Sequence, residues 1–119
     1  MTKIMIVDDE PDLREMLDLM MNKEGYDTKT AQDGKEFLEQ VEQFKPDLVT
    51  LDVMMPGLTT KEILDQLKDK NSNPKIVLLT VVQFSDEEKK KLKQMGNVVH
   101  YITKPFELDE LLNAVKNNL

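Results

Sequence analysis

The sequence predicts a single doubly wound α/β domain, in which a five-stranded parallel sheet carries helices on both faces. Short apolar runs recur along the chain, and segments with the spacing of amphipathic helices separate them. Runs that are this short, continuous and rich in β-branched residues are typical of strands buried on both faces, as in parallel sheets. Strand and helix alternate five times, so right-handed crossovers should distribute the helices over both faces of the sheet.

Four strands follow directly from the apolar runs, and a fifth is weaker. The strong runs are Ile4 to Val7, Leu48 to Leu51, Ile76 to Leu79 and Val98 to Ile102, and the weaker candidate is Asp27 to Ala31. Helical spacing appears between them, with one apolar stripe per segment. The stripes contain Leu13, Met16, Leu17 and Met20; Phe37, Leu38 and Val41; Ile63, Leu64 and Leu67; and Leu108, Leu111, Leu112 and Val115.

The segment from Ser85 to Met95 fits the helical pattern least well. Its start is nevertheless favourable, because Ser85 is a good N-cap and acidic residues follow it. Pro11 suits the first turn of a helix, and Gly25 and Gly96 suit helix ends. We therefore expect five helices in all.

Composition restricts the function. The 119 residues contain 23 acidic and 16 basic side chains, a net charge of −7, and no cysteine. Such acidity disfavours direct binding to nucleic acid or to an anionic membrane, both of which need clustered positive charge. No apolar run approaches the length of a membrane-spanning helix, and no signal-peptide core precedes Asp8. We expect one cytoplasmic domain over residues 1–119 that binds a metal cation or a basic partner surface.

Polar residues stand where the predicted strands end, which is where open α/β sheets bind ligands. If the first and third strands are neighbours, the carboxylates of Asp8, Asp9 and Asp52 converge at one edge. Three ionised carboxylates repel one another unless a cation lies among them, and oxygen-only ligation suits Mg²⁺, with Mn²⁺ also compatible. Lys104 would bring a compensating ammonium to the same edge, and its bond to Pro105 is a candidate for the cis form.

Each of these residues also has a structural interpretation. Asp8 to Glu10 could serve only as an N-cap and as acids favourable to the dipole of the following helix. Asp52 could be an exposed loop acid, and Lys104 could be merely solvated. Residue types and positions alone leave these alternatives open.

In this order, however, the residues resemble the receiver domain of two-component response regulators over essentially the whole chain. The matching residues are Asp8-Asp9, the segment Leu51 to Gly57 around Asp52, Thr80 at the end of the fourth strand, and Tyr101 to Phe106 around Lys104. The resemblance implies a flavodoxin-like sheet with strand order 2-1-3-4-5. It also implies that a histidine kinase or phosphotransfer protein is the partner, and that a monomer or weak homodimer signals to a downstream protein.

The resemblance further implies a role for each residue. Asp52 would be the nucleophile that takes a phosphoryl group from phosphohistidine or a small phosphodonor. Asp8, Asp9, Asp52 and the backbone carbonyl of Met54 would hold Mg²⁺. Lys104 and Thr80 would contact the phosphoryl oxygens, and Thr80 and Tyr101 would pass the change to the surface of the fourth helix, fifth strand and fifth helix.

The sequence departs from the family pattern in three places. Val81 stands where a small residue is usual, so it would crowd the phosphoryl pocket. Thr60 stands where glycine is common near the start of the third helix, and its structural interpretation is a helix cap that replaces a tight turn. One residue more than the common spacing lies between Gly96 and Tyr101.

Three other functions compete with this hypothesis. An aspartate-nucleophile phosphatase typically has a second aspartate two positions after the nucleophile, where this chain has Met54. A flavin-binding module needs hydroxyl and glycine donors after the first strand, where Asp8 to Glu10 would repel a phosphate. A receiver domain that no longer accepts phosphate would act only as an interaction module. We expect no turnover of external phosphoesters, only phosphotransfer to the chain itself and slow self-dephosphorylation.

Overall fold

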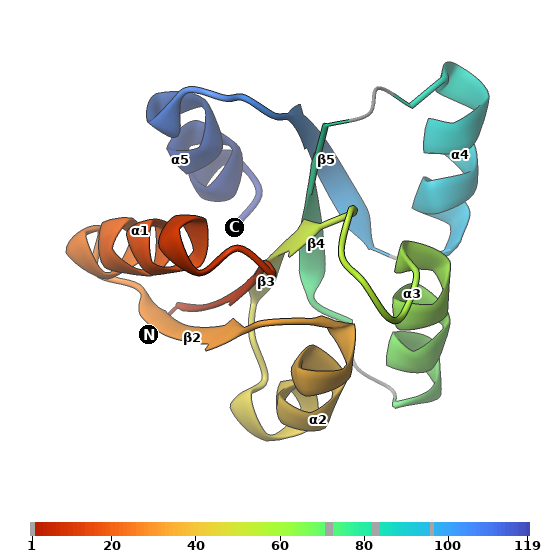
Figure 1. Ribbon diagram of the computed structural model, residues 1–119, viewed down its shortest axis with the longest axis horizontal. Helices are drawn as coiled ribbons and strands as arrows, with labels where there is room; N and C mark the ends of the chain where they lie inside the picture. The colour runs from red at the N-terminus through yellow and green to blue at the C-terminus, as the bar shows by residue number, and fades with distance from the viewer. Residues whose placement is uncertain (1, 71–72, 82–83, 96) are drawn as a thin grey trace.

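The computed structural model describes residues 2–70, 73–81, 84–95 and 97–119, which form alternating strands and helices (Figure 1). The strands are β1 (Lys3–Val7), β2 (Asp27–Ala31), β3 (Leu48–Asp52), β4 (Lys75–Thr80) and β5 (Val98–Thr103). The helices are α1 (Pro11–Lys23), α2 (Gly34–Phe44), α3 (Thr60–Asp69), α4 (Asp86–Met95) and α5 (Leu108–Asn117). All ten predicted elements are confirmed, including the weak strand β2 and the poorly patterned helix α4.

The five strands are parallel and lie in the order β2-β1-β3-β4-β5, as the resemblance implied. Helices α1 and α5 cover one face of the sheet, and α2, α3 and α4 lie on the other (Figure 1). Alternate residues of each central strand point to opposite faces: in β1, Met5 and Val7 pack toward α2 and α3, whereas Ile4 and Ile6 pack toward α1 and α5. This division explains why the central strands are continuously apolar.

The helix starts follow the capping chemistry of their sequences. Pro11 occupies the first turn of α1. At the start of α4, Ser85 Oγ accepts a hydrogen bond from Glu88 N while the Glu88 side chain accepts one from Ser85 N, both at 3.2 Å, a reciprocal capping box. This contact confirms the predicted beginning of α4. Gly25, after α1, has a φ of 90°, as expected of a glycine just past a helix end.

The helix cap that was the structural interpretation of Thr60 lies one residue earlier in the chain. Thr59, not Thr60, is the N-cap of α3, and its hydroxyl accepts from Glu62 N while Glu62 Oε1 accepts from Thr59 N. The reason is spacing, because a capping box needs the acid three residues after the cap, and Glu62 lies three after Thr59. Gly96, which the sequence suggests as the end of α4, lies outside the described residues.

The extra residue before Tyr101 is accommodated inside β5. Ile76 of β4 pairs with Val98, but the next residue, Val77, pairs with His100, so Val99 has no partner in the ladder. This is a β-bulge, with two residues on one strand opposite one on the other. Beyond it the pairing is regular, with Leu78 opposite Tyr101 and Thr80 opposite Thr103.

None of the helices described is long and apolar enough to cross a membrane.

Candidate functional site

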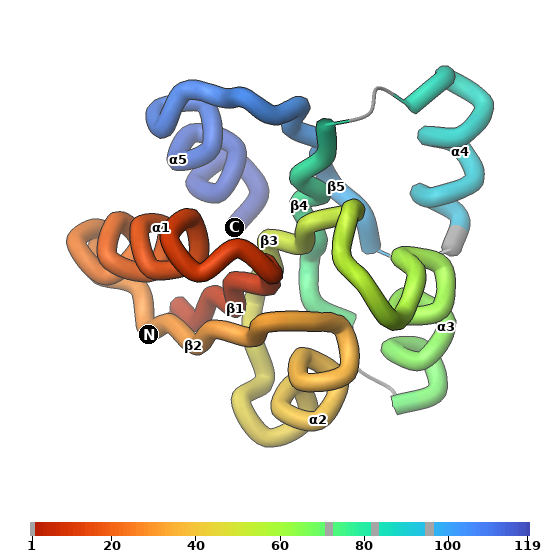
Figure 2. Tube along the Cα trace, in the orientation of Figure 1, coloured from red at the N-terminus to blue at the C-terminus, as the bar shows by residue number. Residues whose placement is uncertain are grey.

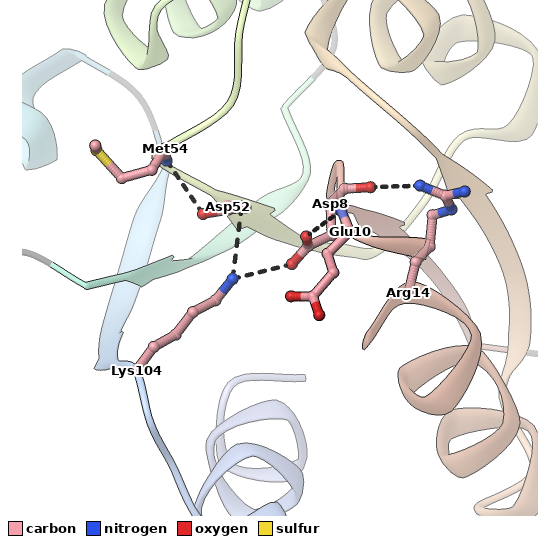
Figure 3. Close-up of polar contacts among 6 residues, drawn as sticks. All are labelled: Asp8, Glu10, Arg14, Asp52, Met54 and Lys104. Carbon is pink, nitrogen blue, oxygen red and sulfur yellow. Dashed lines mark hydrogen bonds and ion pairs between the residues drawn. The ribbon is translucent and has the colours of Figure 1, made fainter. Parts of the chain in front are cut away.

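Four residues that end or follow neighbouring strands lie at the carboxyl edge of the sheet, and Figure 3 shows three of them, Asp8, Asp52 and Lys104. Asp8 follows β1, Asp52 ends β3, Thr80 ends β4 and Lys104 follows β5. Because these strands are parallel neighbours, their carboxyl ends lie at one edge, as the sequence predicted. Asp8 and Asp52 are 1% and 5% exposed, so neither is the exposed loop acid of the alternative interpretation, whereas Asp9 is exposed.

Both the side chain and the backbone of Asp8 make hydrogen bonds. Its Oδ1 accepts from Glu10 N at 3.0 Å and its Oδ2 accepts from Lys104 Nζ at 3.2 Å. Its backbone N donates to Ala31 O at 3.1 Å, and its carbonyl accepts from Arg14 Nη1 at 2.8 Å. Glu10 occupies the N-cap of α1 without a capping bond from its side chain. Asp8 is therefore a fixed buried group rather than part of a helix cap.

Arg14 is a contact that sequence reasoning missed. It is the only arginine of the chain and lies one turn into α1, where its guanidinium reaches back to the end of β1 (Figure 3). The signal available was the short loop between β1 and α1, which brings the first turn of that helix over the strand end.

Asp52 lies between a backbone donor and a cation. Its Oδ1 accepts from Met54 N at 3.1 Å, and its Oδ2 lies 3.5 Å from Lys104 Nζ. Burial raises the pKa of the Asp52 carboxyl above its ordinary value, and the charges of Asp8 and Asp9 add to that rise. The Met54 N–H and the Lys104 ammonium oppose it but do not cancel it.

The three carboxylates could hold a metal ion. Asp8, Asp9 and Asp52 each offer one oxygen, and these oxygens all lie within 4.8 Å of one another. The group carries three negative charges when ionised, and Lys104 supplies one positive charge, so a divalent cation would complete the compensation. Carboxylate oxygens fit Mg²⁺, which usually keeps several waters.

Thr80 and Tyr101 lie on the adjacent strands β4 and β5. Thr80 is buried, and its carbonyl accepts from Lys104 N at 2.7 Å, which ties the lysine's backbone to the end of β4. The Lys104–Pro105 peptide bond is cis, the form suggested by the sequence.

Tyr101 joins β5 to α4. Its phenol donates to the Lys89 carbonyl at 3.0 Å, and its ring contacts Phe84 edge-on with the centroids 6.0 Å apart. The Lys89 ammonium lies 5.8 Å from the same ring's centroid. Burial raises the pKa of the Tyr101 phenol above its ordinary value. The described side chains of α4 include none that is fully buried: Leu92 packs against the core while partly buried, and Tyr101 contacts the helix through the Lys89 carbonyl.

Comparison with known proteins decides the family. The model of the response regulator receiver domain matches residues 4–116. The chain belongs to this family. The receiver domain is 38% identical over 117 residues to sporulation initiation phosphotransferase F of Bacillus subtilis (strain 168). The aligned region covers 98% of this chain and 93% of that protein.

Solved structures agree with the assignment. Chemotaxis protein CheY4 of Vibrio cholerae superposes with a TM-score of 0.89 at 30% identity, covering all of the receiver domain and 99% of CheY4. The response regulator TrrA of Thermotoga maritima, solved in complex with Mg²⁺ and BeF, has a TM-score of 0.82 at 36% identity, and both chains are covered completely. The resemblance drawn from the acidic pair, Asp52 and Lys104 is therefore confirmed at the level of the family.

Proposed function

We propose that the receiver domain accepts a phosphoryl group on Asp52 from the phosphohistidine of a histidine kinase or phosphotransfer protein. The observation that carries this proposal is the position of Lys104 Nζ, 3.5 Å from Asp52 Oδ2 and 3.2 Å from Asp8 Oδ2 in one buried acidic pocket. A buried carboxylate of raised pKa beside a cation is characteristic of a reactive site rather than of a surface loop. The relative named a phosphotransferase supports the same activity.

In this proposal the residues have separate roles. Asp52 attacks phosphorus through a carboxylate oxygen, which its bond to Met54 N helps to orient. Lys104 pairs with the oxygens of the transferred group, and the Thr80 hydroxyl donates to them. Asp8, Asp9, Asp52 and the Met54 carbonyl would hold Mg²⁺, which would supply neutralisation of the negative charge in the site.

Phosphorylation would be transmitted through Thr80 and Tyr101. Engagement of Thr80 by the phosphoryl group changes the packing at the end of β4, to which β5 is directly paired. The hydrogen bond from the Tyr101 phenol to the Lys89 carbonyl would then change, and α4 would shift relative to β5. A downstream protein would bind the surface formed by α4, β5 and α5. The receiver domain would do this in the cytoplasm as a monomer or weak homodimer, without direct contact to nucleic acid.

Mass spectrometry tests the acceptor directly. Incubation with phosphoramidate and Mg²⁺ should add one phosphoryl mass, and Asp52→Asn should abolish this gain. Asp65→Asn, which changes an exposed aspartate on α3, is the matched control and should keep it. A gain that persists in Asp52→Asn would refute the assignment.

A further inference from the structure

An apolar groove opens beside the proposed phosphoryl site. It has a volume of about 320 Å³, and its walls include Leu13 and Met16 of α1, Val81 after β4, and Lys104, Phe106 and Leu108 after β5. The chain after β5 runs back to α5, which lies beside α1, and so brings these segments together (Figure 2). Lys104, whose ammonium lies 3.5 Å from Asp52 Oδ2, is therefore part of the groove's wall.

Apolar exposure is concentrated in this groove. Six large apolar side chains are exposed among the described residues, and three of them line it: Met16, Val81 and Leu108, at 42%, 60% and 41% exposure. Exposed apolar side chains that gather around one hollow indicate a binding site more strongly than the same side chains scattered singly.

The charge of the groove specifies the ligand. Among its described lining residues, Lys104 carries the only charge, and its ammonium lies 3.5 Å from Asp52 Oδ2. A ligand that matches both the lysine and the apolar wall has an anionic head at Lys104 and an apolar body along Met16 and Leu108.

We propose that the groove binds the acyl chain of apolar acyl phosphates. The receiver domain would then use these compounds as small phosphodonors in preference to short acyl phosphates.

This proposal rests on the proposed phosphorylation of Asp52, and its chemistry balances. An Asp52 carboxylate oxygen forms a bond to phosphorus, and the bond from phosphorus to the acyl oxygen breaks. The electron pair leaves with that oxygen as a free carboxylate, and no proton is transferred between the ionised forms. Seating the acyl chain in the groove would hold the phosphoryl group next to Asp52.

Donors of matched reactivity give the test. Acetyl and butyryl phosphate release carboxylates of almost equal basicity, and butyryl phosphate has two more methylenes. A methylene fully removed from water changes a rate by about fourfold, and in an open groove we expect about twofold. Butyryl phosphate should therefore phosphorylate the Mg²⁺-loaded receiver domain about fourfold faster than acetyl phosphate at equal low concentration.

Variants locate the effect. The double variant Met16→Gln with Leu108→Gln should react equally with both donors, while its rate with phosphoramidate, which has no acyl chain, stays unchanged. Leu19→Gln, which alters an exposed leucine of α1 outside the groove's described lining, should keep the fourfold preference. A wild-type preference that persists in the double variant would overturn the proposal.

One further outcome would contradict this proposal, and another would contradict the proposed function on which it rests. Equal wild-type rates with both acyl donors would show that the groove does not bind the acyl chain. If the double variant then also lost transfer from a phosphohistidine protein, the groove would belong to a protein partner. Failure of all donors to modify Asp52 would instead overturn the proposed function, and this outcome is distinguished by the absence of any phosphoryl mass.

Discussion

Lys104 Nζ donates to Asp8 Oδ2 across 3.2 Å, which joins residues 96 positions apart in the sequence. The lysine side chain is 17% exposed and that of the aspartate 1%. The same ammonium reaches Asp52, so one cation partly neutralises two buried carboxylates. Lys104 is therefore the cation that the described structure places beside both carboxylates.

Replacing Lys104 by glutamine should destabilise the metal-free domain. Two buried carboxylates would lose their cation, and we expect the free energy of unfolding to fall by about 2 to 3 kcal/mol, less than for a fully buried pair. Mg²⁺ should then stabilise the variant more than the wild type, because no ammonium competes with the metal. Urea denaturation in chelator and in Mg²⁺ measures both effects.

Lys116→Gln is the control for this experiment, because it removes an exposed ion pair with Glu24. It should change stability by no more than about 0.5 kcal/mol. An equal loss in the two variants would contradict the special role of Lys104.

Asp9 should contribute to Mg²⁺ binding although it is exposed. At 100 times the dissociation constant, Mg²⁺ should add about 2.7 kcal/mol to the free energy of unfolding of the wild type. If Asp9→Asn weakens affinity tenfold, the gain at the same concentration falls to about 1.4 kcal/mol. Thermal melting with and without Mg²⁺ measures this difference. Asp12→Asn, an exposed acid of α1, should retain the full gain, and an unchanged gain in Asp9→Asn would remove that residue from the site.

The raised pKa of Asp52 predicts an unusual pH dependence in the absence of metal. A carboxyl whose pKa is higher in the folded state binds its proton more tightly there, so its ionisation costs stability. The cost appears as the pH rises from the ordinary value of 3.8 through the raised folded value, and it persists at neutral pH. Asp52→Asn should therefore be more stable than the wild type at pH 7 in chelator, with the difference lost below pH 3.8. Equal stability of the two proteins at pH 7 would contradict the predicted cost.

The ionised carboxylate is also the nucleophile in the proposed reaction. A bound divalent cation favours the ionised carboxylate. In saturating Mg²⁺ the phosphorylation rate should therefore fall only at a pH below the raised pKa of the metal-free carboxyl, as measured by the initial rate of phosphoryl mass gain.

Thr80 should be needed for signalling but not for phosphorylation. Thr80→Ala should still gain phosphoryl mass, because Asp52 and Lys104 remain in place. It should lose most of the phosphorylation-dependent ¹⁵N chemical-shift change around Tyr101, since the proposed hydroxyl contact is missing. Thr103→Ala, on the neighbouring strand and exposed, is the control and should keep the change. Wild-type shifts in Thr80→Ala would argue against the coupling.

Val81 should slow both halves of the phosphorylation cycle. It lies with Lys104 in the wall of the groove, and its two γ-methyl groups are stiff about χ1. Val81→Ala should accelerate phosphorylation by phosphoramidate and the later loss of phosphate, each by up to about tenfold, which corresponds to about 1.4 kcal/mol in a barrier. Both rates follow from phosphoryl mass against time. Leu19→Ala should leave them unchanged, and slower or equal rates in Val81→Ala would show that Val81 does not border the reaction path.

The order of elements and the meeting of Asp8, Asp52 and Lys104 were predictable because they follow from regular physical patterns. Buried parallel strands need continuous apolar runs, and their parallel arrangement places the strand ends at one edge. The structural interpretation of Thr60 as a cap misses by one residue, because two threonines are adjacent and only the position of Glu62 selects Thr59.

Other features could not be predicted from local pattern. The contact between Arg14 and the Asp8 carbonyl depends on how α1 is oriented above β1. The place of the bulge in β5 depends on pairing with β4, since Val98, Val99 and His100 are all plausible strand residues on their own. Tertiary packing decides both features, and neither leaves a periodic signal in the chain.

The bulge at Val99 has a consequence for how chains of this kind can vary in length. The additional residue is absorbed at the entrance of β5, and from Tyr101 to Thr103 the strand is again in step with β4. Insertions or deletions upstream of Tyr101 therefore need not displace Lys104, which lies one residue beyond the strand. The approach to β5, and with it the surface around α4, can therefore differ in length while Lys104 stays beside Asp52.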